Sequence, residues 1–446
     1  MFNFKKPKIT INLLAHDGIT SLYTGVGRIA FDSLRVLCED KKISKLVHSV
    51  NAITGKYNNK CLGFSETIKN RSIKLLNKKN GRLLEALNGS HGDISYGDIS
   101  NWRYVSTSSA SLLYSLSQQN PNDLYINLCL DTPFAQTASF FQQYSEDEKK
   151  KHIFVWIPHS TVKIHKVDSA IQGYNEYYDQ RFEWERVAVN LANKTRGVYV
   201  GCVGKFMREH LINEYSCEPE KLLDFTNGLD VEDARFSQKM GEHEIEKILD
   251  QYGIPKDKKL MLSFGRLEPY KGFDLTIKIG GHLDPKTIIT VLIAQPYSQQ
   301  DPIIGEYRQL MEKYNPKGIF ISDYDFNLPH VLLRWHRTKI LLVPSLAEPF
   351  GLIPEEARLY KNPYLRIVAM NRDGYLEQIS DGKDGFLMDL TTVGESSEKI
   401  NKILSLSNKQ ANEMADTGFA RAIANYNLAN NLYQSASKII EECQRQ

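Results

Sequence analysis

Residues 259–272, KLMLSFGRLEPYKG, join a β-strand pattern to a short loop that carries two cations. The apolar run at 259–264 predicts a buried strand, and a helical pattern begins near Phe273. A strand, a short loop and a helix in this order form the repeating unit of α/β layers with a parallel sheet. The stretch therefore predicts an α/β fold with this loop at the carboxyl end of a strand.

Short apolar runs alternate with helical patterns along most of the chain. Further strands are expected at residues 8–15, 45–52, 124–130, 153–157, 197–203, 222–225, 287–294, 318–322, 339–344, 366–369 and 385–389. Helical patterns between them include residues 28–38, 182–193 and 205–214. This alternation predicts parallel sheets covered by helices.

The segment at 215–257 divides this series into two halves. It carries the turn signal NGLD at 227–230, followed by a charged helical pattern. We expect two doubly wound, Rossmann-like domains, residues 1–218 and 219–426, and a C-terminal helix at 427–446 that packs back on the first domain. Because open α/β sheets bind ligands beyond the carboxyl ends of their strands, functional motifs should lie there, facing a cleft between the domains.

Length and composition fit a globular protein. The chain has 446 residues, which predicts two or three domains, and 56 basic against 53 acidic residues give a net charge of +3. This balance gives no reason to expect a nucleic-acid partner. Apolar runs are shorter than the ~20 residues of a membrane-spanning helix, and the N-terminus lacks the pattern of a signal peptide. The six cysteines form no Cys-x-x-Cys pair, which suits a reducing compartment, so we expect a cytoplasmic protein.

The most basic stretch spans residues 70–82. Its cations are Arg71, Lys74, Lys78, Lys79 and Arg82. A solvated surface explains such a run without any partner. The functional alternative is a patch that faces anionic lipid or an anionic acceptor, which would place the protein peripherally on the inner face of a membrane.

The loop at 265–272 carries the first functional motif. Arg266 and Lys271, five residues apart at a strand's carboxyl end, can converge on one anion of high charge density. Gly265 and Gly272 let the backbone come close to that anion, and the following helix adds its positive end. An exposed turn that happens to contain two cations is the structural alternative.

A second motif, SLAEPFGLIPEEA at 345–357, follows the strand at 339–344. Pro354 suits the first position of a helix, which places Glu355 and Glu356 in the first turn. Carboxylates in a first turn complement the helix dipole by ~0.3–1 kcal/mol, so these two need no function. That explanation does not cover Glu348, which precedes a Pro-Phe-Gly turn whose amides are expected to point at the same cleft.

Together, G-R-L-x-x-x-K-G and the later E-P-F-G-L-x-x-x-E resemble the family-4 retaining glycosyltransferases of the GT-B fold. Seven residues separate Glu348 from Glu356, as in that family. The resemblance covers most of the chain. Further segments similar to the family's motifs are VGKFMREHL at 203–211, NGLD at 227–230, GYLEQI at 374–379 and DGKDGFL at 381–387.

The resemblance implies roles for the residues of the second domain. Arg266 and Lys271 would hold the donor's diphosphate and neutralise the charge that grows on the leaving group. Glu356 would accept hydrogen bonds from the ribose hydroxyls, and Glu348 would face the transferred sugar. Three backbone amides would bond the sugar's hydroxyls, those of Phe350, Gly351 and Leu352.

In the first domain, residues 25–30 (GVGRIA) have the letters of a dinucleotide fingerprint. A true fingerprint turns immediately after its strand and is followed by an acid at the end of the second strand. Here about ten residues intervene and the second strand ends without an acid, which disfavours a dehydrogenase. The resemblance instead implies that Gly25 and Gly27 bring amides to the diphosphate and the acceptor side.

Two strand-end residues of the first domain complete the implied site. His159 follows the strand at 153–157, where the family has a histidine that bonds the donor sugar near the reacting centre. Asp131 follows the strand at 124–130 and is assigned to the acceptor side. A structural role is the alternative for His159.

No metal or other cofactor is expected, because the nucleotide sugar is a substrate and Arg266 and Lys271 supply the charge that a metal would. The triplet Asp-x-Asp at 323–325 is the metal motif of a different glycosyltransferase fold and recurs by accident. The sequence contains no H-E-x-x-H, P-loop or G-x-S-x-G motif.

The resemblance implies retaining transfer of a hexose-type sugar from a nucleotide diphosphate sugar, with UDP preferred, to a hydroxyl acceptor in glycan or glycoconjugate synthesis. A glycan, a lipid-linked molecule and a protein all remain candidate acceptors, and the sequence carries no signal of an oligomeric state. One alternative is a nucleotide-sugar epimerase or sugar-phosphate synthase on the same scaffold. Another is a non-catalytic subunit that binds nucleotide or glycan, although the intact set of motif residues disfavours it.

Overall fold

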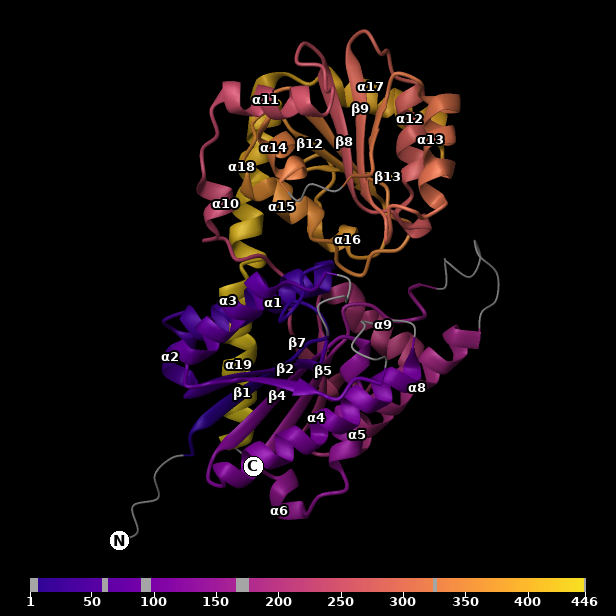
Figure 1. Cartoon of the computed structure of the whole chain (residues 1–446). Helices are drawn as coiled ribbons and strands as arrows, with labels where there is room; N and C mark the ends of the chain where they lie inside the picture. Colours follow the sequence, from indigo (N-terminus) through magenta and orange to yellow (C-terminus); the bar gives the residue numbers. More distant parts are fainter. Residues whose placement is uncertain (1–6, 58–62, 90–97, 166–175, 324–326, 445–446) are drawn as a thin grey trace. The chain divides into compact units, whose positions relative to one another are not determined.

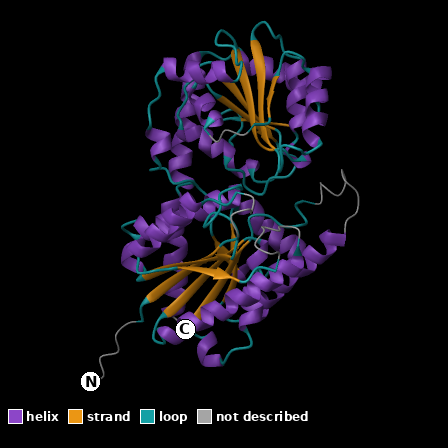
Figure 2. Ribbon diagram, viewed as in Figure 1, coloured by secondary structure: helices purple, strands orange, loops and turns teal. Residues whose placement is uncertain are grey.

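The computed structural model describes residues 7–57, 63–89, 98–165, 176–323 and 327–444. The chain divides into two compact units, and each is a twisted parallel sheet with helices on both faces (Figures 1 and 2). The first unit comprises Met1–Lys166, Tyr174–Asp230 and Asn427–Gln446, and the second is built on Val231–Tyr426. The expected fold class, two doubly wound α/β units, is therefore confirmed.

The first unit contains a seven-stranded sheet of order β3-β2-β1-β4-β5-β6-β7. Its strands are β1 (Ile9–Leu14), β2 (Ser49–Gly55), β3 (Leu83–Ala86), β4 (Leu124–Leu130), β5 (His152–Ile157), β6 (Val198–Cys202) and β7 (Leu222–Asp224). Its helices include α1 (Gly25–Glu39), α2 (Ile43–Leu46), α3 (Glu66–Lys78), α4 (Ile99–Gln119), α5 (Thr137–Phe141), α6 (Glu146–Lys149), α8 (Glu176–Lys194), α9 (Lys205–Tyr215) and α19 (Leu428–Gln444). The strand order reverses between β1 and β4, which is where such sheets open a crevice for ligands.

The second unit repeats this plan with a six-stranded sheet of order β10-β9-β8-β11-β12-β13. Its strands are β8 (Lys259–Arg266), β9 (Ile288–Gln295), β10 (Ile319–Ile321), β11 (Thr338–Val343), β12 (Arg366–Met370) and β13 (Phe386–Met388). Its helices include α10 (Ala234–Ser237), α11 (Glu242–Gln251), α12 (Phe273–Gly281), α13 (Ile303–Tyr314), α14 (Leu328–Arg334), α15 (Ile353–Leu359), α16 (Tyr375–Gln378), α17 (Val393–Leu404) and α18 (Asn408–Asn425). The reversal lies between β8 and β11, the strands that lead into the two motif loops.

Three details differ from the sequence-based expectation. Residues 43–46 form α2, so the second strand begins at Ser49 rather than near residue 45. Strand β3 was not expected, because it is short and only its last residue, Ala86, is buried. β7 pairs with β6, which places residues 219–230 with the first unit rather than the second.

Helix α19 packs on the first unit. Asn431 donates its side-chain amide to the Thr226 carbonyl at 3.1 Å, and the Ser435 hydroxyl donates to the Asp224 carbonyl at 2.5 Å. Among the described residues, no helix combines the length and the apolar character that crossing a bilayer requires.

Candidate functional site

The loop after β8 places both motif cations against one buried residue, Tyr270, which is 6% exposed. Arg266 donates from Nη2 to the Tyr270 hydroxyl at 2.6 Å and from Nη1 to the Tyr297 hydroxyl at 3.1 Å. The Lys271 ammonium lies 5.2 Å from the centre of the Tyr270 ring, within the range of a cation–π contact. The two cations therefore contact the same buried side chain.

The loops after β8 and β11 meet closely. Gly272 has φ +65°, and a Cβ atom there would come within 2.4 Å of the Pro344 carbonyl oxygen, so only glycine fits between them. The Leu346 amide also donates to the Tyr270 carbonyl at 2.7 Å. These contacts bring the second motif to the cations of the first.

Glu348 is the direct partner of Lys271. Its Oε2 lies 2.5 Å from Lys271 Nζ, and both side chains are largely buried. Burial alone would lower the pKa of Lys271, but the Glu348 carboxylate more than offsets this and raises the pKa above its ordinary value. The lysine is therefore a charged donor at neutral pH.

The turn behind Glu348 is held in one conformation. Gly351 has φ +78°, and a Cβ atom there would come within 2.8 Å of both Glu348 Cγ and Tyr375 Cε1. The Glu348 amide donates to Asp373 at 3.1 Å. Within the described residues, the amides of Phe350, Gly351 and Leu352 donate to no protein acceptor, and this leaves them able to bond a ligand.

Glu356 lies in the first turn of α15. Its Oε1 is 3.6 Å from Arg235 Nη2, and both side chains are largely buried. No nitrogen of the Arg235 guanidinium has a hydrogen-bond partner among the described residues. Arg235 follows the NGLD turn, and nothing in its sequence neighbourhood signalled this contact.

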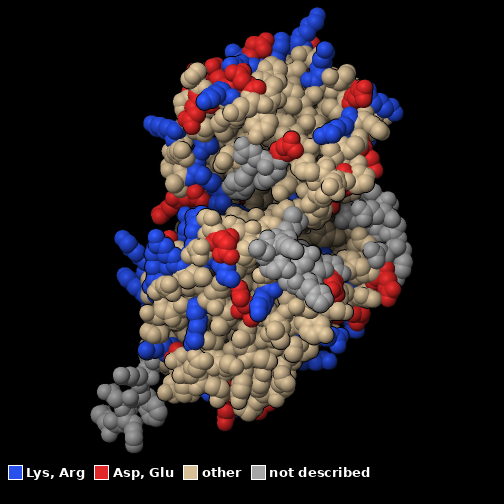
Figure 3. All heavy atoms as spheres, viewed as in Figure 1, with Lys and Arg blue, Asp and Glu red and all other residues tan. Residues whose placement is uncertain are grey.

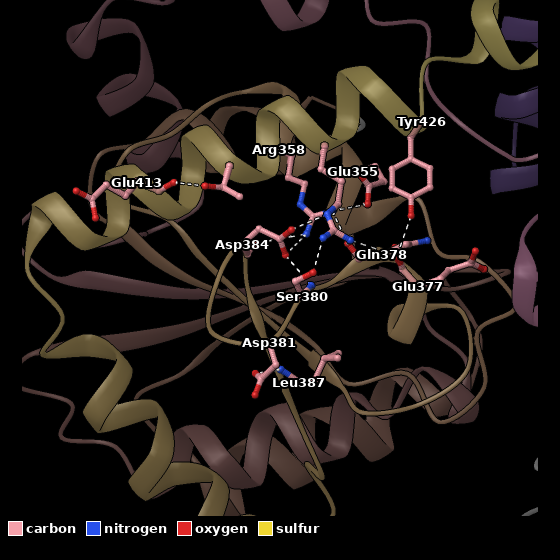
Figure 4. A network of polar contacts seen from close by, with 12 residues as sticks. Glu355, Arg358, Glu377, Gln378, Ser380, Asp381, Asp384, Leu387, Glu413 and Tyr426 are labelled. Carbon is pink, nitrogen blue, oxygen red and sulfur yellow. Dashed lines mark hydrogen bonds and ion pairs between the residues drawn. The ribbon is translucent and has the colours of Figure 1, made fainter.

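Glu355, the neighbour of Glu356, belongs to a buried network instead (Figure 4). Arg358 donates to Glu355 at 2.7 Å, to Asp384 at 3.0 Å and to the Gln378 carbonyl at 2.9 Å. Gln378 in turn donates to the Phe350 carbonyl, which ties the network to the turn behind Glu348. Burial, partly offset by Arg358, raises the pKa of Glu355 from 4.5 to about 7.

In the first unit, His159 is 7% exposed and lies directly beyond β5. Asn227 Nδ2, which can only donate, lies 3.3 Å from His159 Nδ1. Burial lowers the pKa of His159 to about 4, although Asp131 opposes this, so the ring is neutral at pH 7. Its proton is then on Nε2, which has no partner among the described residues.

Asp131 lies at the end of β4 with φ +63°, a conformation that costs a non-glycine residue energy. Its amide donates to the Ile157 carbonyl at 2.9 Å, and its own carbonyl accepts from Trp156 Nε1 at 3.1 Å. Its carboxylate acts electrostatically on His159. The strained backbone thus holds this side chain beside the histidine.

The glycine loop runs into α1, with Thr24 as its N-cap. Asp17, which sequence reasoning missed, is 1% exposed and accepts from the amides of Gly18 and Thr24 at 2.8 and 2.7 Å. A Cβ atom at Gly27 would come within 2.1 Å of Asp17 Oδ2, whereas one at Gly25 meets nothing within 4 Å. Gly27 is therefore required by Asp17, and Gly25 stands at the open end of the helix.

Of the triplet at 323–325, Asp323 follows β10, and its second aspartate lies outside the described residues. No group of three or more potential metal ligands occurs among the residues that the structure describes.

The chain resembles known proteins in part of its sequence and in nearly its whole structure. Residues 244–421 match the family model described as glycosyl transferases group 1. D-inositol 3-phosphate glycosyltransferase from Corynebacterium glutamicum is 28% identical over 185 residues, which are 41% of this chain and 43% of that protein. The match thus spans less than half the length of this curated relative.

Two solved structures superpose on nearly the whole chain. Sucrose-phosphate synthase from Thermosynechococcus elongatus gives a TM-score of 0.72 at 14% identity, and covers 98% of this chain and 100% of its own. Anabaena Alr3699/HepE in complex with UDP-glucose gives 0.66 at 16% identity, with the same coverage. At these identities the likeness concerns the fold.

Proposed function

Because residues 244–421 match the family model described as glycosyl transferases group 1 and the whole chain has the GT-B fold, we propose that this protein is a glycosyltransferase. It moves a hexose-type sugar from a nucleotide diphosphate sugar to a hydroxyl acceptor and retains the anomeric configuration. UDP is the proposed nucleotide, since one structural neighbour binds UDP-glucose. The observation that carries the proposal is the group formed by Arg266, Lys271 and Glu348 at one strand edge.

The chemistry follows from charge. As the bond from sugar to phosphate breaks, negative charge grows on the departing diphosphate, and preorganised cations stabilise it most. Arg266 and Lys271 supply that charge, so we propose that no metal is needed and that a chelator leaves the rate unchanged. The acceptor attacks from the face that the diphosphate leaves, and the departing phosphate oxygen takes the acceptor's proton.

The remaining residues are assigned by position. The sugar is bound by Glu348 and by the amides of Phe350, Gly351 and Leu352. Glu356 accepts hydrogen bonds from the ribose hydroxyls. In the first unit, the neutral His159 donates from Nε2 to the donor sugar, and Asp131 faces the acceptor. Gly25 offers its amide at a helix N-terminus. The Gly27 amide instead donates to Thr24 Oγ1 at 2.9 Å, so Gly27 serves this terminus by leaving room for Asp17.

The experiment begins with a thermal-shift screen of UDP-, GDP- and ADP-sugars. A ligand at 100 times its dissociation constant adds about 2.7 kcal/mol to stability. The stabilising donor is then incubated with candidate acceptors, and the anomeric configuration of the product is read by NMR. A product of inverted configuration would contradict retention. Isomerised donor sugar in the absence of acceptor would identify an epimerase, and binding without transfer to any acceptor would identify a non-catalytic subunit.

We also propose an acceptor presented at the inner face of a membrane. Basic side chains gather over α2 and α3 (Figure 3), although Lys78 pairs with Glu39 at 2.5 Å and Lys79 donates to the Ser44 carbonyl at 3.0 Å. Neutralising Lys74, Lys78 and Lys79 together should abolish sedimentation with vesicles that contain anionic lipid. Equal sedimentation of this variant and the wild type would leave a water-soluble glycan or protein as the acceptor.

A further inference from the structure

Tyr270 contacts three parts of the candidate donor site at once. Its hydroxyl accepts from Arg266 Nη2 at 2.6 Å, its ring lies under the Lys271 ammonium at 5.2 Å, and its carbonyl accepts from the Leu346 amide at 2.7 Å. The loop that begins at Leu346 carries Glu348, the partner of Lys271. One buried residue thus connects both cations and the loop that faces them.

Such a contact matters because arginine and lysine are flexible side chains of like charge. Ordering each of them costs side-chain entropy, and cations held close together repel each other. A buried phenol offers an acceptor for one cation and a ring face for the other, and both interactions favour the charged forms. The free protein therefore already holds the two cations in an ordered arrangement, and the binding of the anion loses less side-chain entropy.

Tyr270 differs in this respect from the second phenol on Arg266. Tyr297 is 48% exposed and accepts from Arg266 at the longer distance of 3.1 Å, whereas Tyr270 is 6% exposed. The buried ring cannot move aside without disturbing the turn in which it lies. Of these two hydroxyls, that of Tyr270 is the shorter and more buried contact of the guanidinium.

We propose that Tyr270 is a positioning residue that orients Arg266 and Lys271 toward a shared diphosphate. This inference rests on the proposed function and deepens it. The residue acts on the diphosphate through the two cations, so its removal should affect the affinity for a nucleoside diphosphate and leave the affinity for the bare nucleoside unchanged.

The test is titration calorimetry of Tyr270→Phe, which removes one oxygen and keeps the ring over Lys271. UDP, GDP and ADP are the probes, each with its nucleoside. The nucleoside diphosphate that binds the wild type should bind Tyr270→Phe about tenfold more weakly, as expected for the loss of a hydrogen bond to a charged group. Its nucleoside should bind both proteins equally, whereas general damage to the fold would weaken both ligands.

Tyr125→Phe is the matched control. Tyr125 is 1% exposed and donates to the Leu116 and Asn120 carbonyls, at the start of β4 in the first unit. Tyr125→Phe also removes a buried, hydrogen-bonded hydroxyl and keeps the ring, but the affinity for the diphosphate should not change.

A double-mutant cycle with Arg266→Ala separates positioning from other effects. If Tyr270 acts through Arg266, Tyr270→Phe should weaken the binding of the diphosphate no further in the Arg266→Ala background. Equal affinity of Tyr270→Phe and the wild type, or a full tenfold loss in the absence of Arg266, would overturn the inference and leave the proposed function standing. If none of the three diphosphates bound the wild type, the proposed function would fail, and the inference with it.

Discussion

His159 illustrates how one neighbour fixes the chemistry of a site residue. Asn227 can only donate to Nδ1, so the neutral imidazole carries its proton on Nε2. Asn227 belongs to the NGLD turn, which at the sequence level marks only a boundary between domains. In the structure, that turn also determines which nitrogen of His159 donates.

Asn227→Asp should move the proton of the neutral His159 ring from Nε2 to Nδ1. A carboxylate would accept from Nδ1, raise the pKa of His159 from about 4 and leave Nε2 without a proton once the ring is neutral. We expect the turnover of the variant to fall as the pH rises through this higher pKa, because the doubly protonated ring still donates from Nε2 and the neutral ring does not. The pH profile of turnover, compared with that of Asn227→Ser, measures this effect. Superimposable profiles for Asn227→Asp and the wild type would rule out a donor role for Nε2.

At the residue scale, the sequence identified the groups but not their partners. Arg266, Lys271 and Glu348 stand in two motif loops whose residue types and spacing pointed to them, whereas His159 was selected through the family resemblance. Their neighbours come from distant parts of the chain or are common residue types in loops. Asp17 under Gly27 and Arg235 beside Glu356 could be found only from the fold.

At the element scale, the start of α1 depends on one close approach. Gly27→Ala would place a methyl group 2.1 Å from the Asp17 carboxylate, which must then move and release the amides that it holds. We expect a melting temperature several degrees lower, in line with the ~1–3 kcal/mol that overpacking typically costs. Gly25→Ala is the matched control, because its Cβ atom meets nothing, and its melting temperature should equal that of the wild type. Equal melting temperatures for both variants would show that the contact with Asp17 is unimportant.

The packing of α15 against α18 should depend on pH through Glu355. The folded state raises the pKa of this residue from 4.5 to about 7. Its contribution to stability is therefore complete below pH 4.5 and is lost as the pH rises through 7. Glu355→Gln mimics the protonated form, so its melting temperature should exceed that of the wild type at pH 8 and approach it at pH 5. A difference between the two proteins that does not change with pH would contradict the account.

Expected elements matched the structure where apolar runs were long and uniform. The run at 124–130 coincides with β4, because every residue of a central parallel strand is covered on both faces. The missed elements are short, and β3 is also an edge strand. β3 has four residues with one buried, and α2 is a single turn, so neither has enough periodicity to be distinguished from a loop.

At the scale of the whole molecule, the first six strands of the first unit follow the same order as the six strands of the second, and each reversal point carries a loop that leads into a helix. Because both units follow one plan, a resemblance found in a few motif loops was enough to indicate the architecture of the full chain. The motifs lie at strand ends, and their spacing along the sequence is determined by the strands and helices between them.

The central claim is that Arg266 and Lys271 hold the diphosphate of the donor, and the initial rate of nucleoside diphosphate release with donor and acceptor present tests it most directly. Arg266→Ala and Lys271→Ala should each lower this rate by about a hundredfold or more, on the scale of losing one donor to a developing oxyanion. Lys278→Ala, which removes a lysine paired with Asp274 at 2.8 Å on α12, should keep the rate of the wild type. Unchanged rates in both Arg266→Ala and Lys271→Ala would contradict the assignment of this site.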